Sequence, residues 1–242
     1  MSRPSLVLVP GLLCDAVLWN HQEDSLKDVA EVTVADVSGH DTMAELARAV
    51  LASAPERFAL AGLSMGGYIV QEIMRQAPER VTRLALISTT ARTDTPEAAR
   101  QRRDMIRLSR LGNFIGLTAR RLHLLIHPDR LNDQELTSAV LEMARRVGRD
   151  TFVRQQTAIL GRKDGREDLK SISCPALILC GRQDAITPPE VHEEMAAAVP
   201  GSKLVIVEDA GHLVPLERPH AVSAVLRYWL QDGGASPDQS PP

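Results

Sequence analysis

One pentapeptide in this chain could supply a catalytic nucleophile. The residues GLSMG at 62–66 follow an apolar run and open an amphipathic helical pattern, which is the G-x-S-x-G spacing in a strand–turn–helix setting. Such a turn exposes Ser64 only if its backbone takes a strained, positive-φ conformation, and Gly62 and Gly66 avoid the resulting side-chain collisions. Because the turn aims the first helical amides at the serine, we expect the backbone N–H of Met65 to stabilise an oxyanion.

Two further residues could activate that serine. A serine hydroxyl is a weak nucleophile at neutral pH and needs a general base, which in turn needs an orienting carboxylate. Asp184 follows the apolar run 176–179 and His212 follows the run 204–207, and they lie 28 positions apart, which is the length of about one βαβ unit. Both side chains are therefore expected at the carboxyl ends of strands, on the edge of the sheet that carries Ser64. Without such partners the pentapeptide would indicate only a tight turn.

Other polar residues are rival candidates for these roles. Glu208 and Asp209 stand three or four positions before His212 on the same predicted loop, whereas an orienting carboxylate normally approaches the imidazole from a different strand. His40 and Asp41 could form a second dyad, but their glycine-rich neighbourhood favours a structural loop. We therefore assign the orienting carboxylate to Asp184.

The histidine and cysteine spacings do not predict a metal site. His123 and His127 have the i, i+4 spacing that zinc ligands can have, but no third ligand accompanies them and the Glu of a His-Glu-x-x-His motif is missing. Cys14 lies two residues beyond Leu12 and is a candidate pocket residue, with nothing nearby in the sequence that would lower its pKa. The sequence predicts that neither a metal nor an organic cofactor is required.

The elements that must position these residues are visible as alternating strands and helices. Near-continuous apolar runs are typical of strands that are covered on both faces; they occupy residues 6–9, 32–35, 58–61, 84–87, 176–179 and 204–207. Helical periodicity lies between these runs and after the last one, where the apolar positions are Val222, Val225, Leu226 and Trp229. This alternation predicts an α/β fold with a mainly parallel six-stranded sheet and right-handed crossovers.

The strand rhythm stops in the middle of the chain. We expect a core at residues 1–90 and 171–232, a helical lid at residues 91–170 with helix breaks at Gly112, Pro128 and Gly148, and a disordered polar tail at residues 233–242. The segment 91–170 has 17 Lys+Arg against 11 Asp+Glu, although the whole chain has a net charge of -3. The expected lid is therefore basic and the expected core acidic.

A stripe of arginines marks the first helix of the expected lid. Such stripes are usually solvated faces, but an arginine that pointed into the cleft would favour a substrate with a carboxylate. The stripe consists of Arg100, Arg103, Arg107 and Arg110. The sequence leaves open which face of this helix looks inward.

The composition excludes several classes of protein. The 242 residues include 28 Lys+Arg, 31 Asp+Glu and 44% hydrophobic residues, as in ordinary globular proteins. The mild acidity and the seven aromatic residues argue against nucleic-acid binding, and the odd count of three cysteines favours a reducing compartment. No apolar run approaches the ~20 residues that cross a bilayer, and the run at 6–9 is too short for a signal peptide. We expect a cytoplasmic protein without a membrane partner.

Together these motifs resemble those of the α/β-hydrolase fold family, in its serine carboxylesterase and lactonase branch, over nearly the whole chain. The matching segments are PGLL at 10–13, DVSGHD at 36–41, GLSMGG at 62–67, GRQD at 181–184 and GH at 211–212, and Ser, Asp and His occur in the family's order. Many relatives have His-Gly where this chain has Pro10-Gly11. Relatives also often open with two additional strands, for which this chain has no residues. The resemblance therefore implies a sheet with the family's strand order 4-3-5-6-7-8. It also implies that the lid is inserted after the fourth strand of this chain.

The resemblance also implies a role for each candidate residue. Ser64 would be the nucleophile, His212 the general base and then acid, and Asp184 the group that fixes the imidazole tautomer. The oxyanion hole would consist of the backbone N–H groups of Leu12 and Met65.

The expected activity is therefore hydrolysis of small to medium carboxylic esters through an acyl-enzyme, because a lid of this size would close over a pocket. Two alternatives remain open. The first keeps the same triad but changes the reaction, to a lactone or enol-lactone hydrolase or to a carbon–carbon bond hydrolase or lyase on an anionic substrate. The second is a hydrolase-like small-molecule receptor with little turnover. A lipid-surface lipase is disfavoured because the lid is rich in arginine and has no broad aromatic or leucine face. The oligomeric state and the acyl-chain preference do not follow from the sequence.

Overall fold

The computed structural model of the chain describes residues 3–112 and 117–232. Its strands are β1 (Ser5–Val9), β2 (Glu31–Val34), β3 (Phe58–Leu63), β4 (Val81–Ile87), β5 (Ala176–Gly181) and β6 (Lys203–Val207). Its α-helices are α1 (Asn20–Leu26), α2 (Met43–Ser53), α3 (Met65–Gln76), α4 (Pro96–Arg110), α5 (Gln134–Leu160), α6 (Pro189–Ala198), α7 (Val214–Glu217) and α8 (Pro219–Gln231). Short 3-10 helices are η1 (Ala16–Trp19), η2 (Pro78–Arg80), η3 (Ala119–Leu124), η4 (Pro128–Arg130) and η5 (Asp168–Ser171).

The six strands form one parallel sheet in the order β2-β1-β3-β4-β5-β6. With β1 and β2 as the family's third and fourth strands, this order is 4-3-5-6-7-8, so the predicted fold class is confirmed. The register pairs Val9 with Gly62 and Leu63 with Ile87. The carboxyl ends of the central strands therefore lie together at one edge of the sheet.

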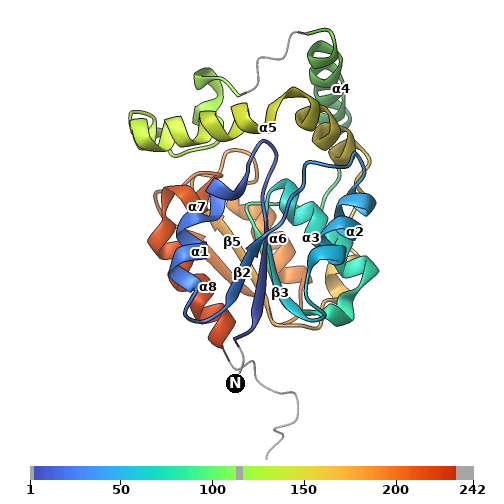
Figure 1. The fold of residues 1–242 in the computed structure, drawn as a ribbon, viewed down its shortest axis with the longest axis vertical. Coiled ribbons are helices and arrows are strands. Elements are labelled where there is room, and N and C mark those ends of the chain that lie inside the picture. Colours follow the sequence, from blue (N-terminus) through green and yellow to red (C-terminus); the bar gives the residue numbers. More distant parts are fainter. Residues whose placement is uncertain (1–2, 113–116, 233–242) are drawn as a thin grey trace, which may run out of the picture.

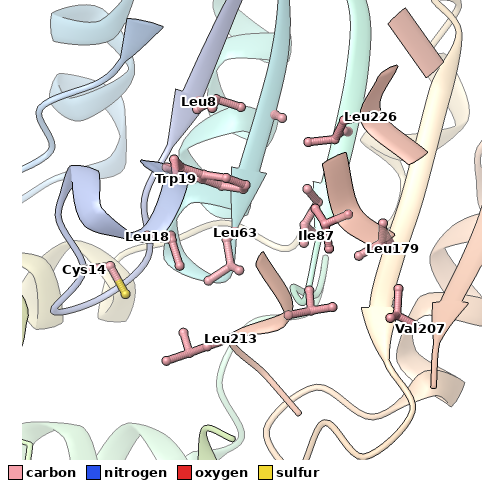
Figure 2. Packing of buried hydrophobic residues seen from close by; sticks show 14 of the residues in the cluster. Leu8, Cys14, Leu18, Trp19, Leu63, Ile87, Leu179, Val207, Leu213 and Leu226 are labelled. Atoms are coloured by element: carbon pink, nitrogen blue, oxygen red, sulfur yellow. The ribbon is translucent and has the colours of Figure 1, made fainter. Parts of the chain in front are cut away.

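Helices cover both faces of the sheet, with α1 and α8 on one face and α2 and α3 on the other (Figure 1). Alternate residues of a strand point to opposite faces: Leu6 and Leu8 pack in the layer with Trp19 and Leu226, whereas Val7 packs with α2 and α3. Figure 2 shows the first layer, where Leu8, Trp19 and Leu226 converge from β1, η1 and α8. This double coverage explains why the strands read as continuous apolar runs.

Between β4 and β5 the described residues form helices and no strand (Figure 1). The helix breaks that the sequence indicates are present: α4 ends just before Gly112, η4 begins at Pro128, and α5 is kinked at Gly148, whose φ is 73°. We propose that the segment 91–170 acts as a lid, because α4 and α5 share a cavity with the loops after β1 and β3. The predicted disordered tail at 233–242 lies outside the described residues.

Candidate active site

Ser64 sits in the sharp turn between β3 and α3, with φ 55° and ψ -114°. This strained backbone is tolerated because the neighbouring glycines let the chain pack closely. A Cβ on Gly62 would lie 2.5 Å from the carbonyl oxygen of Gly66, and a Cβ on Gly66 would lie 2.2 Å from that of Val9. The Ser64 N–H donates to the Ile87 carbonyl at 3.0 Å and so continues the sheet into the turn.

A buried hydrogen-bond network of Thr89 and His192, which no sequence motif predicts, supports this turn. The Thr89 hydroxyl donates to the Ser64 carbonyl at 2.8 Å, and the Thr89 N–H donates to Nε2 of His192 at 3.0 Å. Because Nδ1 of His192 lies 3.2 Å from the Pro188 carbonyl, it is the ring nitrogen that carries the proton. Burial lowers the pKa of His192 below 6.5 and keeps it neutral in this arrangement. No short motif marks Thr89 and His192, since they lie 25 and 128 positions beyond the serine.

Asp184, on the loop after β5, is a buried carboxylate whose two oxygens both accept hydrogen bonds. One oxygen accepts the backbone N–H groups of Ile186 and Thr187, both at 2.9 Å, and the other accepts the Thr187 hydroxyl at 2.9 Å. Burial by itself would raise the pKa of this carboxyl, but His212 and the two backbone amides outweigh it and lower the pKa below 3.8. The side chain is therefore held ionised.

His212, on the loop after β6, lies against this carboxylate. Its Nδ1 is 2.9 and 3.0 Å from the two oxygens of Asp184. This contact assigns the proton of the neutral imidazole to Nδ1 and leaves Nε2 as an acceptor. His212 and Ser64 line the same cavity, although no hydrogen bond joins their side chains within the described part of the chain. Such contacts are often long in unliganded enzymes and shorten when substrate binds.

The rival carboxylates point elsewhere. Glu208 is exposed and pairs with Arg182 at 2.8 Å, and Asp209 is exposed and pairs with Arg218 at 3.4 Å. Neither contacts His212, whose carboxylate partner in the structure is Asp184.

The two amides expected to form the oxyanion hole are available. Among the described residues, neither the Leu12 N–H nor the Met65 N–H has an acceptor. Met65 is the first residue of α3, so its amide is one of the unsatisfied donors of a helix N-terminus. Leu12 follows Gly11, at which a Cβ would lie 3.4 Å from the Cβ of Ser64. Both amides therefore belong to segments that pack beside the serine.

Ser64, His212 and Leu12 line a cavity of about 540 Å³ between the sheet edge and helices α4 and α5. Its polar lining includes Ser64, Tyr68, Gln156 and His212, and most other lining side chains are apolar: Leu12, Leu13, Met105, Leu108, Leu117, Leu124, Leu125, Val140, Met143, Phe152, Ile159, Ile186 and Leu213. Such a largely apolar cavity with a few convergent polar groups suits a small organic ligand.

The arginine that lines the cavity from α4 is Arg102 and not a member of the predicted stripe. Arg102 is paired with Asp94 at 2.9 Å, and Asp94 also pairs with Arg162 at 2.8 Å. Burial would raise the pKa of Asp94, but the two guanidinium groups outweigh it and lower the pKa below 3.8. The stripe residues Arg100, Arg103, Arg107 and Arg110 are all exposed.

The remaining candidates have structural surroundings. His123 and His127 do not share a helix, because His123 lies in η3 whereas His127 precedes η4 and accepts the Asp129 N–H. No group of three or more metal-ligating side chains occurs among residues 3–112 and 117–232. Burial raises the pKa of the cavity-lining thiol of Cys14 to about 12, so this cysteine is a poor nucleophile at neutral pH. His40 and Asp41 lie exposed on the loop before α2.

No helix in the described ranges has the combination of length and apolar character needed to span a bilayer.

Comparison with known proteins places the chain among hydrolases. Two curated relatives are pimeloyl-[acyl-carrier protein] methyl ester esterases. The one from Aliivibrio salmonicida is 29% identical over 241 residues, covering 93% of this chain and 92% of the relative. The one from Nitrosomonas europaea is 26% identical over 231 residues, covering 89% and 91%.

Solved structures agree with this placement. A thermophilic esterase from Thermogutta terrifontis is 31% identical, with a TM-score of 0.86 and coverage of 96% of this chain and 90% of the esterase. An enol-lactonase from Burkholderia xenovorans shares the fold, with 24% identity, a TM-score of 0.86 and coverage of 95% and 92%. The model of the alpha/beta hydrolase family matches residues 6–225. The chain belongs to the alpha/beta hydrolase family.

Proposed function

We propose that this protein is a serine hydrolase that cleaves small to medium carboxylic esters through an acyl-enzyme intermediate. The observation that carries the proposal is the contact of His212 Nδ1 with both oxygens of Asp184, in a cavity that Ser64 also lines. A buried, ionised carboxylate that fixes the imidazole tautomer is what a serine needs in order to have a base nearby.

The proposed reaction follows from these positions. As the Ser64 hydroxyl attacks the ester carbonyl, Nε2 of His212 accepts its proton and Asp184 stabilises the resulting imidazolium. The N–H groups of Leu12 and Met65 stabilise the negative charge on the carbonyl oxygen. His212 then donates the proton to the departing alkoxide, which leaves as the alcohol. A water molecule, deprotonated by His212, attacks the carbonyl carbon of the acyl-enzyme and forms a tetrahedral intermediate. When this intermediate collapses, its bond to Ser64 Oγ breaks, His212 donates the proton to Oγ, and the carboxylic acid is released.

The cavity and the relatives support an ester as the substrate. Apolar side chains form most of the cavity wall, and its volume of about 540 Å³ suits an acyl chain or alcohol group of modest size. The curated relatives are named as methyl ester esterases and the 31% identical structure as an esterase. Lactones contain the same ester bond, so the same groups could open them.

The proposal is tested by a substrate panel and one variant. The wild-type protein and Ser64→Ala are assayed with p-nitrophenyl esters of increasing acyl length, with lactones and with diketo acids. We expect the wild type to hydrolyse the short and medium esters and Ser64→Ala to be inactive with an unchanged melting temperature. Preferential turnover of diketo acids would replace the proposal with carbon–carbon bond cleavage. Ligand-induced stabilisation without turnover would indicate a receptor.

A further inference from the structure

The loop after β1 holds the proposed oxyanion amide in an unusual turn. The Cys14 N–H donates to the Gly11 carbonyl at 3.1 Å, and Leu13, the third residue of this turn, has a φ of 59°. Glycine or asparagine is usual at such a position, because other side chains crowd the backbone there. Pro10, at the start of the loop, has no N–H and no polar side chain with which to fix it. Within the turn, the Cys14 Sγ–H also lies 3.6 Å from the Leu12 carbonyl. One group from outside the loop adds to these local contacts.

That group is a glutamine from the segment 91–170. Oε1 of Gln155, on α5, accepts the Leu13 N–H at 3.1 Å, and its Nε2 lies 3.4 Å from the Val37 carbonyl on the loop after β2. Gln155 is 1% exposed and the Leu13 bond is buried. A buried N–H without an acceptor is costly, so this bond favours the observed turn over alternatives that would leave Leu13 unpaired.

We propose that Gln155, which lies on the proposed lid, is a positioning residue that fixes the orientation of the Leu12 N–H in the oxyanion hole. The proposal rests on the ester-hydrolase function proposed above. Leu12 lies between two fixed neighbours: Gly11, at which a Cβ would lie 3.0 Å from Leu63, and Leu13, which Gln155 holds. Loss of the Gln155 bond frees one of these two attachments, and the Leu12 N–H is then less accurately aimed at the oxyanion. Gln155 itself touches no reacting atom in this mechanism.

A second contact between α5 and this loop provides a matched control. Arg146, on the other side of the Gly148 kink, pairs with Asp15 at 2.7 Å, and its side chain is 43% exposed. An exposed ion pair contributes little to stability, and this one does not contact the turn at Leu13. Arg146→Met therefore weakens a contact between α5 and the loop without removing the acceptor for the Leu13 N–H.

The experiment compares Gln155→Met, Gln155→Glu and Arg146→Met with the wild type. Methionine has nearly the shape of glutamine but lacks both the acceptor for the Leu13 N–H and the donor that faces the Val37 carbonyl. Glutamate at this buried position is expected to be protonated, because burial disfavours its charge, and then keeps an acceptor for Leu13 and an O–H donor for Val37. Three quantities are measured for each protein: kcat and KM for a p-nitrophenyl ester, the inhibition constant of an alkylboronic acid, and the melting temperature. The boronic acid forms a tetrahedral adduct with the serine and so reports on binding of the transition state.

For Gln155→Met we expect kcat to fall by about 10- to 100-fold with little change in KM, and the boronic acid to bind more weakly by a similar factor. Gln155→Glu should regain most of the activity, and Arg146→Met should resemble the wild type. The proposal is overturned if Gln155→Met keeps the wild-type kcat, or if it loses thermal stability while the boronic acid binds as before. It is also overturned if folded Gln155→Glu is as impaired as Gln155→Met. A wild-type protein without ester hydrolysis would instead refute the proposed function.

Discussion

Replacement of Gly66 by alanine tests how the Ser64 turn packs against the loop after β1, which carries the proposed oxyanion amide of Leu12. The new Cβ would lie 2.2 Å from the Val9 carbonyl oxygen and 2.8 Å from that of Pro10. Ordinary van der Waals contact begins at 3.4 Å, so the end of β1 and the Ser64 turn must move apart by about 1.2 Å. Because backbone atoms make the contact, no side-chain rotation can relieve it. The proposed oxyanion amide of Leu12 lies two positions after Pro10 and is expected to move with it.

A displacement of about 1 Å in a catalytic group can cost on the order of 100-fold in rate. We therefore expect Gly66→Ala to lower kcat/KM for a p-nitrophenyl ester by about 100-fold, and overpacking to lower the free energy of unfolding by about 1–3 kcal/mol. The matched control is Gly39→Ala, since a Cβ at Gly39 would meet no atom within 4 Å. Steady-state kinetics and urea unfolding measure both effects. If Gly66→Ala kept the wild-type kcat/KM, the close packing of β1 against the turn between β3 and α3 would not position the catalytic groups.

Further predictions concern the carboxylates. Asp184→Asn should lower kcat by up to ~10⁴-fold through the wrong imidazole tautomer, whereas Asp209→Asn should stay near wild type in the same assay; the reverse result would overturn the assignment. Because the pKa of Asp184 is lowered in the fold, its contribution to stability is present above pH 3.8 and is lost as pH falls through the folded-state pKa. Urea unfolding should therefore show the stability difference between wild type and Asp184→Asn shrinking below pH 3.8, and a constant difference would contradict this. Glu217 accepts the backbone N–H groups of Gly211 and His127 at 2.9 and 2.6 Å. Glu217→Leu should therefore lower the free energy of unfolding by about 1–3 kcal/mol for each N–H that loses its acceptor. An unchanged urea midpoint would show that these bonds contribute nothing to stability.

The sheet could be predicted from the sequence because its central strands are covered on both faces. A strand such as β5, buried at all six positions, must be apolar throughout. The pairing of Asp184 with His212 could be anticipated because each residue directly follows a strand of a parallel sheet. The order and direction of the strands, which the sequence predicts, therefore bring Asp184 and His212 to the same edge of the sheet.

The contacts that depend on packing could not be predicted. Gln155 and Thr89 bond to backbone groups on elements far away in the sequence, and no motif marks such partners. The arginine of α4 that lines the cavity is Arg102, whereas the predicted stripe is exposed. Which face of α4 looks inward is set by its packing against α5, which the sequence does not show. The i, i+4 spacing of His123 and His127 does not place them on one helix, because η3 ends at Leu124 and Pro128 begins a new 3-10 segment.

The central claim is that Ser64 is the nucleophile, activated by His212. The most direct test treats the folded protein with a fluorophosphonate and locates the adduct by peptide mass spectrometry. We predict one adduct, on the peptide that contains Ser64, at a rate that falls sharply in His212→Gln. An adduct on a different residue, or steady ester hydrolysis by a protein whose Ser64 remains unmodified, would contradict the claim.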